Sequence, residues 1–285
     1  MKKTLFATTA IVAAFGMGST AAQAQDASLD VSLGSAFFAG WADQDTPGQA
    51  GFHQSDYDFT TDTEFDVRGS VTLDNGIEFG AQIQIEGDAG ATNNVDENNI
   101  YASGSFGRVE LGHQDGAGDT LNYGATNVKA VFFGTYNNGT GSLVNYGFSG
   151  APKLTQFVDS GDATKITYYT PRFAGLRIGV SHAPDGDTDP VGPARTATAT
   201  TDQWEGGIEY LNSFNGFDVA ASVTAATRNA SQQNDDDYAI SPGFVIGFGG
   251  FEFGAGASFG ENGGVDQQFY DAGIGYSVGP WSVSL

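Results

Sequence analysis

Residues 57–86, "YDFTTDTEFDVRGSVTLDNGIEFGAQIQIE", alternate between two kinds of side chain on either side of the "DNG" triplet. One set is mostly apolar and consists of Tyr57, Phe59, Phe65, Val67, Val71, Leu73, Ile77, Phe79, Ala81, Ile83 and Ile85. The other set is polar and includes Asp58, Asp62, Glu64, Asp66, Arg68, Glu78, Gln82 and Glu86. Because successive side chains of a strand point to opposite faces, this pattern predicts a hairpin with one apolar and one charged face. The class of protein depends on which face meets water.

The same alternation recurs along the chain and predicts about 13 antiparallel strands, the last of them starting at Trp281. It is clear in "RVELG", "KITYYTP", "GLRIGVSH", "QWEGGIEYL" and "FDVAASVTA". With 42 glycines, 13% aromatic and only 16% charged residues, the composition suits strands and turns better than amphipathic helices. The body of the chain has no run of about 18 apolar residues, which excludes a transmembrane helix. The absence of cysteine excludes a disulfide framework and a thiol-ligated metal site.

The predicted connections alternate between short and long. Short turns are expected at 74–76, 105–107, 171–175, 213–216, 249–250 and 279–280, and long polar segments near 43–56, 88–98, 114–163, 183–202, 228–237 and 260–268. A meander with short turns at one end and long loops at the other is typical of an outer-membrane barrel. In the first hairpin, a three-residue "DNG" loop would place Leu73 opposite Ile77 and keep the apolar faces together.

The N-terminus reads as a targeting signal. Lys2 and Lys3 precede an apolar run, and "AQA" at 22–24 supplies small residues for cleavage. We therefore expect a signal peptide over 1–24 and a mature chain over 25–285. Without the two lysines, 9 of the 11 basic residues remain against 34 acidic ones, a net charge near −25. Such a charge excludes nucleic acid as a partner.

Aromatic residues indicate that the apolar face meets lipid. They gather beside the short turns, as at Phe106, Phe173, Phe214, Phe217, Phe248, Phe251 and Trp281, and near the long loops, as at Trp41, Tyr57, Phe59, Trp204 and Tyr238. Two belts are what two membrane interfaces favour. A soluble sandwich also alternates, but its connections do not alternate so strictly, and it has little use for the long segment 114–163. The fold predicted is all-β: a transmembrane antiparallel up-and-down β-barrel whose charged face lines a water-filled lumen.

The strand count suggests an incomplete barrel. Thirteen is odd, whereas bacterial single-chain barrels have an even number of strands. An open edge in lipid would leave unpaired backbone groups that cost several kcal/mol each. We therefore expect residues 25–285 to lack the closing strands, and three more would give 16, enough to enclose an aqueous channel.

Three stretches resemble the Gram-negative general porins, especially those of photosynthetic alphaproteobacteria such as Rhodobacter. They are "LDNGIEFGAQIQIEG", "NNIYASGSFGRVELGHQDGAG" and "KITYYTPRFAGLRIGVSH". The resemblance implies a 16-stranded barrel, usually a homotrimer, in the outer membrane among lipid and lipopolysaccharide. It also implies that segment 114–163 is the family's loop 3, which folds inward and narrows the pore. The function implied is passive diffusion of small hydrophilic solutes and ions, without enzymatic activity.

Charged residues on the lumen face are the candidate pore lining. In the family, acidic loop-3 residues face basic wall residues, which implies here Asp115, Asp119 and Asp159 against Arg68, Arg108, Lys165 and Arg177. These bases are scattered and outnumbered by acidic neighbours on the same face: Asp58, Asp62, Glu64, Asp66, Glu78, Glu110, Glu205 and Glu209. Because charged pore linings favour counter-ions, we expect a modest preference for cations.

Other sites and functions have less support. His53, His113 and His182 lie in or beside different loops, and Ser181 and His182 point to opposite faces, so a metal site or a lipase-type pair built on histidine is not expected. The acidic loops 185–189 and 234–237 are candidate Ca²⁺ sites, although neither has EF-hand spacing and flexible acidic tips are common. No other cofactor is expected. The alternative functions are a structural, adhesive or receptor barrel and a secreted soluble β-protein.

Overall fold

The computed structural model describes residues 24–41, 57–87, 95–128, 158–186, 201–229 and 236–285. Its strands form one 13-stranded sheet in which each strand pairs only with its neighbours in sequence, from β1 to β13. All twelve pairings are antiparallel. This is the predicted up-and-down meander, with the predicted number of strands. Within the described residues, no helix has the length and apolar character needed to cross a membrane.

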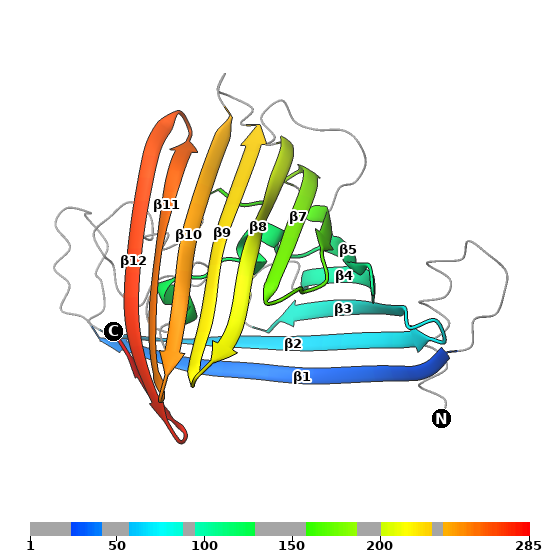
Figure 1. Ribbon diagram of the computed structural model, residues 1–285, viewed down its shortest axis with the longest axis horizontal. Helices are drawn as coiled ribbons and strands as arrows, with labels where there is room; N and C mark the ends of the chain where they lie inside the picture. Colours follow the sequence, from blue (N-terminus) through cyan, green and yellow to red (C-terminus); the bar gives the residue numbers. More distant parts are fainter. Residues whose placement is uncertain (1–23, 42–56, 88–94, 129–157, 187–200, 230–235) are drawn as a thin grey trace.

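The strands are β1 (Ala24–Trp41), β2 (Tyr57–Leu73), β3 (Glu78–Glu86), β4 (Val95–Gly104), β5 (Gly107–His113), β6 (Thr164–Tyr169), β7 (Leu176–Asp185), β8 (Thr201–Phe214), β9 (Phe217–Asn229), β10 (Asp237–Phe248), β11 (Phe251–Asn262), β12 (Val265–Val278) and β13 (Trp281–Ser284). Between β5 and β6 lie the one-turn helix α2 (Ala117–Thr120) and the 3-10 helix η1 (Ala125–Asn127). The sheet is strongly curved, since β1–β3 run at a large angle to β8–β12 (Figure 1).

The two faces of the sheet have the exposure expected of a barrel in lipid. On β7–β9, the apolar side chains of Ile178, Ile208 and Val223 are half exposed. The polar side chains of Ser181 and Thr224, on the opposite face, are 2% and 1% exposed. Large exposed apolar faces are unfavourable in water, whereas lipid accepts them. The apolar face is therefore the outer one.

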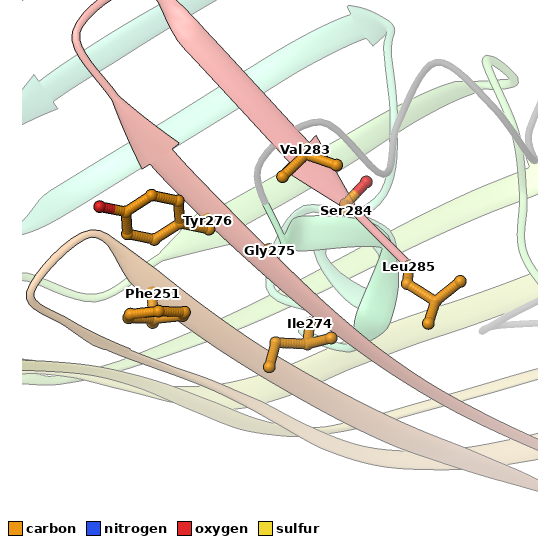
Figure 2. A pocket seen from close by; sticks show the side chains of 7 residues that line it. All are labelled: Phe251, Ile274, Gly275, Tyr276, Val283, Ser284 and Leu285. Carbon is orange, nitrogen blue, oxygen red and sulfur yellow. The ribbon is translucent and has the colours of Figure 1, made fainter.

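Aromatic rings line the outer face near the tight turns. Phe106, Phe173, Phe214, Phe217, Phe248, Phe251 and Trp281, the predicted belt at this end, are all exposed. The rings of Phe217 and Phe248 stack across β9 and β10 at 4.5 Å. Figure 2 shows a neighbouring apolar groove of about 230 Å³, where Phe251, Ile274 and Leu285 lie along β11–β13.

The predicted turn at 74–76 is confirmed, and the predicted long loop at 260–268 is wrong. The Leu73 N–H donates to the Ile77 carbonyl at 2.9 Å, and Gly76 takes a φ of 79°, which is the three-residue loop expected from "DNG". Residues 260–268, by contrast, are not a long loop, because Asn262 pairs with Val265 across a two-residue turn. Both turn residues, Gly263 and Gly264, have positive φ, which matches the backbone of a tight hairpin.

Two predictions on the extent of the domain stay predictions. The expected signal peptide falls almost wholly on residues 1–23, outside the described part of the chain. The described strands pair in one open series, and a closed barrel of 16 strands is not tested by them.

Candidate functional site

Residues 114–128, here named the crossing segment, lie against the polar face of the sheet. Their backbone N–H groups donate to wall side chains on three different strands. The N–H of Ala117 donates to Ser181 Oγ on β7 at 2.7 Å, and that of Tyr123 to Ser222 Oγ on β9 at 3.0 Å. The N–H of Ala125 donates to Asp271 Oδ1 on β12 at 2.5 Å. Side chains of the wall thus accept the hydrogen bonds of these three backbone N–H groups, in place of backbone carbonyls. The segment includes the helix α2, drawn in green in Figure 1.

Glycines on the wall allow the crossing segment to lie this close. A Cβ atom at Gly243 would stand 1.7 Å from the Tyr123 carbonyl oxygen, and one at Gly254 would stand 2.7 Å from that of Gly124. Ser222, Gly243, Gly256 and Asp271 are register partners from β9 to β12. Near Tyr123 and Ala125 the segment therefore lies along this lateral row of the sheet, in which small residues leave room for its backbone.

Residues 158–163, the other described end of the predicted loop 3, lie beside the start of the crossing segment. Ser160 donates to the carboxylate of Glu205 on β8 through its hydroxyl, and through its N–H at 3.3 Å. The Lys165 ammonium, on β6, donates to the carbonyl oxygens of Gln114 and Gly161. One cation thus links the two described ends of the predicted loop 3, and residues 129–157 lie outside the described part.

Three carboxylates gather at these ends. Glu97, Asp115 and Asp162 each offer an oxygen within 4.8 Å of the others, an arrangement that could hold a cation. Desolvation and repulsion from Asp115 raise the pKa of Asp162 to about 6, and burial likewise raises the pKa of Asp115. The group therefore concentrates negative charge in a place where water is partly excluded.

Asp119, on α2, extends this acidic surface. Its side chain is exposed to water, yet the surrounding protein partly desolvates the carboxylate. Desolvation first, and repulsion from Asp115 and Asp159 second, raise the pKa of Asp119 to about 7. Its charge therefore changes near neutral pH.

The wall arginines are paired with carboxylates. Glu209, 1% exposed on β8, accepts a hydrogen bond from Arg172 in the β6–β7 turn and forms an ion pair with Arg177 on β7. The Tyr123 hydroxyl also donates to Glu209, at 3.2 Å. A buried carboxylate is tolerated when it is paired and hydrogen-bonded in this way. The same contacts fix the crossing segment to the arginine pair.

Four of the predicted site residues line one cavity of about 250 Å³, namely Arg108, Glu110, Asp115 and Arg177, whereas Glu64, Asp66 and Arg68 lie apart from it on β2. Arg68 pairs with Asp66 at 2.6 Å on β2, and Arg108 pairs with Glu110 on β5. Asp115 and Asp119 lie on the crossing segment, and Glu64 lies on β2 opposite Glu86 of β3. The four predicted bases do not form one compact cluster, since four strands, β3 to β6, lie between Arg68 on β2 and Arg177 on β7.

Lys165 is placed differently from the prediction of an open wall base. Its side chain is 3% exposed and is covered by the crossing segment. The alternation of side chains along β6 correctly assigns Lys165 to the polar face. It does not indicate that the crossing segment covers that part of the face.

Several residues of the site were not predicted. Glu97 was predicted to be part of a loop over 88–98, whereas β4 already begins at Val95. The alternation of Glu97, Asn99 and Tyr101 could have revealed this strand. Arg172 lies in a turn, where the alternation of a strand does not assign side chains to a face. Asp162 joins the acidic group because it lies close in space to Glu97 and Asp115, residues that are distant in the sequence.

The candidate Ca²⁺ loops are only partly described. Residues 187–189 and 234–235 fall outside the described part. Asp237 is held by Arg228 at 3.0 Å and by the N–H of Gly263 at 2.7 Å, which occupies both of its oxygens.

Comparison with known proteins agrees with this architecture. Residues 7–285 match the family model of the Gram-negative porins. A mutant of Rhodobacter blastica porin has 15% sequence identity and a TM-score of 0.50, over 91% of this chain and 93% of the other. OmpT of Vibrio cholerae, in its trimer form, has 14% identity and a TM-score of 0.47, over 90% and 88%. Curated protein sequences gave no significant match.

At such low identity the structural likeness supports the fold alone. The family match covers residues 7–285 and so includes all the described strands, from Ala24 to Ser284. The chain belongs to the Gram-negative porin family.

Proposed function

We propose that this porin forms a water-filled channel for passive diffusion of small hydrophilic solutes and ions, with no covalent chemistry. The observation that carries the proposal is the crossing segment, which lies along the polar face from Ser181 on β7 to Asp271 on β12. A segment in this position narrows the lumen and leaves the route for solutes between itself and the wall of β2–β5.

The channel is proposed to prefer cations modestly. Every arginine in the described residues is paired with a carboxylate: Arg68, Arg108, Arg172, Arg177 and Arg228. Their positive charge is therefore largely neutralised. The acidic group of Glu97, Asp115 and Asp162 is in excess of these pairs, and Lys165 is its nearby cation. An acidic excess in the lumen attracts counter-ions.

The proposed setting is the outer membrane of a Gram-negative bacterium, as a homotrimer among lipid and lipopolysaccharide. The apolar outer face and its aromatic belt support the membrane setting. The trimer form of Vibrio cholerae OmpT supports the assembly by analogy. Light scattering of the purified protein in detergent measures this directly: a mass of three chains is expected, and a monomer contradicts the trimer.

Planar-bilayer recording of the full chain tests the function. We expect stepwise conductance increases, with a reversal potential in a salt gradient that favours potassium over chloride. An absence of steps from protein that inserts into bilayers would contradict the channel and favour a structural or receptor barrel. A reversal potential favouring chloride would contradict the charge assignment alone.

A further inference from the structure

Asn-Gly pairs occur in three of the described hairpins, at 75–76, 215–216 and 262–263. In each pair the glycine has a positive φ, of 79°, 82° and 66° respectively. A fourth pair, at 138–139, lies outside the described part of the chain. Because glycine has no side chain, its backbone nitrogen can approach the side-chain amide of the preceding asparagine. The three described pairs therefore offer the same chemistry in different surroundings.

At the first pair, both groups that would react already have hydrogen bonds. The Gly76 N–H donates to the Leu73 carbonyl oxygen at 2.9 Å. The Asn75 Oδ1 atom accepts from the Ile77 N–H at 3.1 Å. The turn thus holds the backbone nitrogen and the side-chain amide in place, and both bonds must break before the two groups can react.

The third pair is held by residues of β9 and β10. The Gly263 N–H donates to Asp237 Oδ1 at 2.7 Å, and Asn262 Oδ1 accepts from the Arg228 guanidinium at 3.3 Å. Asp237 is only 3% exposed. Water therefore competes weakly for this carboxylate, and a hydrogen bond in such surroundings is stronger than one in water.

The second pair has neither kind of bond. Phe214 pairs with Phe217 across a two-residue turn, so that Asn215 and Gly216 form its tip, and both are exposed. Within the described structure, neither the Gly216 N–H nor the Asn215 side chain makes a hydrogen bond. Asn215 has a φ of 50°, in the left-handed region that an Asn-Gly hairpin turn requires. Water therefore reaches both groups that would react.

We propose that Asn215 is a site of spontaneous deamidation and that Asn75 and Asn262 are protected from it. The Gly216 nitrogen gives its proton to water and attacks Asn215 Cγ; a C–N bond forms, the bond from Cγ to the side-chain nitrogen breaks, and ammonia leaves. Water then opens the resulting cyclic succinimide at either carbonyl carbon and yields aspartate or isoaspartate. Water is the only co-reactant, and no atom is oxidised or reduced. The proposal does not depend on the function proposed above.

The product changes the hairpin that joins β8 and β9. Both forms add a negative charge between Phe214 and Phe217, two residues of the aromatic belt. Isoaspartate also lengthens the backbone of the turn by a methylene group, and the length of a turn fixes the register of its strands. The isoaspartate form should therefore loosen the pairing of Phe214 with Phe217.

Peptide mapping by mass spectrometry measures the three reactions side by side in the full chain, folded in detergent at mildly alkaline pH. We expect Asn215 to be converted at least about tenfold faster than Asn75 or Asn262, which corresponds to about 1.4 kcal/mol in activation free energy. The product should be a mixture of aspartate and isoaspartate, which electron-transfer fragmentation distinguishes. Aspartate alone would contradict the succinimide route.

The same chain unfolded in concentrated urea is the control for local sequence. Each of the three asparagines precedes a glycine, so without their folded surroundings they should react at similar rates. A preference for Asn215 that persists unchanged in urea would assign it to neighbouring residues in the sequence and would overturn the structural argument.

Two variants separate the reaction from the protection. Asn215→Gly removes the amide and suits a turn with positive φ at both positions, so deamidation in this turn should be abolished. Asp237→Ala removes the acceptor of the Gly263 N–H and should speed the conversion of Asn262, with the rate at Asn75 unchanged. If this variant unfolds, all three rates should rise to those measured in urea, which again assigns the protection to the folded structure.

Two results would overturn the proposal. One is equal conversion of the three asparagines in the folded wild-type chain, which would mean that their hydrogen bonds do not control the reaction. The other is an Asp237→Ala chain that stays folded and converts Asn262 as slowly as the wild type does.

Discussion

Glu209 is the residue on which the wall and the crossing segment converge. It is almost completely buried, and it holds two arginines from different parts of β6–β7 together with the hydroxyl of Tyr123. The alternation in the sequence assigned Glu209 to the polar face and indicated nothing more about it. Its structural role depends on a turn residue, Arg172, and on a residue 86 positions away, Tyr123.

Replacing Glu209→Gln should therefore change both stability and selectivity. Removing one partner of a buried ion pair costs on the order of 3 kcal/mol, and it leaves Arg172 and Arg177 without their counter-charge. We expect a lower midpoint in denaturant unfolding and a reversal potential shifted toward chloride. Asp74→Asn, in an exposed turn, is the control and should change stability by less than about 0.5 kcal/mol. An unchanged reversal potential in the Glu209 variant would contradict its role in neutralising the arginines.

At the scale of elements, the glycines of β10–β12 are matched to the crossing segment. They are not needed for turns, because Gly243 and Gly254 lie inside strands and have no positive φ. What they provide is close approach of the segment's backbone to the wall.

Gly243→Ala tests this match. The added methyl group would meet the Tyr123 carbonyl, so the segment must move away from the wall and into the lumen. We expect a destabilisation of about 1–3 kcal/mol and a smaller single-channel conductance. Gly247→Ala, on the same face of the same strand, meets only ordinary contacts of 3.6 Å or more and should keep the wild-type conductance. Equal conductance in both variants would contradict the docking of the segment on β10.

The strands themselves predict a contrast between adjacent residues of β3. Ile83→Lys places a charge on the outer face and should impair membrane insertion by about 2–4 kcal/mol near mid-membrane. Gln82→Lys places the same charge on the inner face; the protein should insert normally and shift its selectivity toward anions. Insertion into lipid vesicles and reversal potentials measure the two effects. Similar behaviour of the two variants would mean that the inner and outer faces are assigned wrongly.

At the scale of the whole molecule, acidic excess predicts a pH-dependent channel. The pKa of Asp119 is raised to about 7 and that of Asp162 to about 6, so both carboxylates are charged at pH 8 and largely protonated at pH 5. The preference for cations should therefore weaken as pH falls from 8 to 5. Reversal potentials across this range measure it, and Asp119→Asn should remove part of the change between pH 8 and 6. A pH-independent selectivity in the wild-type protein would exclude these carboxylates from the conduction path.

Much of the fold was predictable because its signals are local. The alternation of residues 57–86 sets both the strands and their faces, since the side-chain period of a strand is fixed by backbone geometry. The length of the "DNG" loop correctly predicted that Leu73 lies opposite Ile77, because the loop length fixes the register of a hairpin. The turn at Gly263 and Gly264 was missed because it lies inside a stretch whose polar residues, such as Glu261, resemble a loop when the pairing partner is not known.

The site was less predictable because it is made by contacts between distant residues. The sequence by itself determined the strands, their apolar and charged faces, and the acidic excess, since each of these follows from residues near one another in the chain. Only the tertiary structure decided that Lys165 is covered, that Glu209 neutralises two arginines and that the crossing segment rests on Gly243. The physical reason is the path of residues 114–128, whose contacts reach as far as Ala125 with Asp271, 146 residues apart.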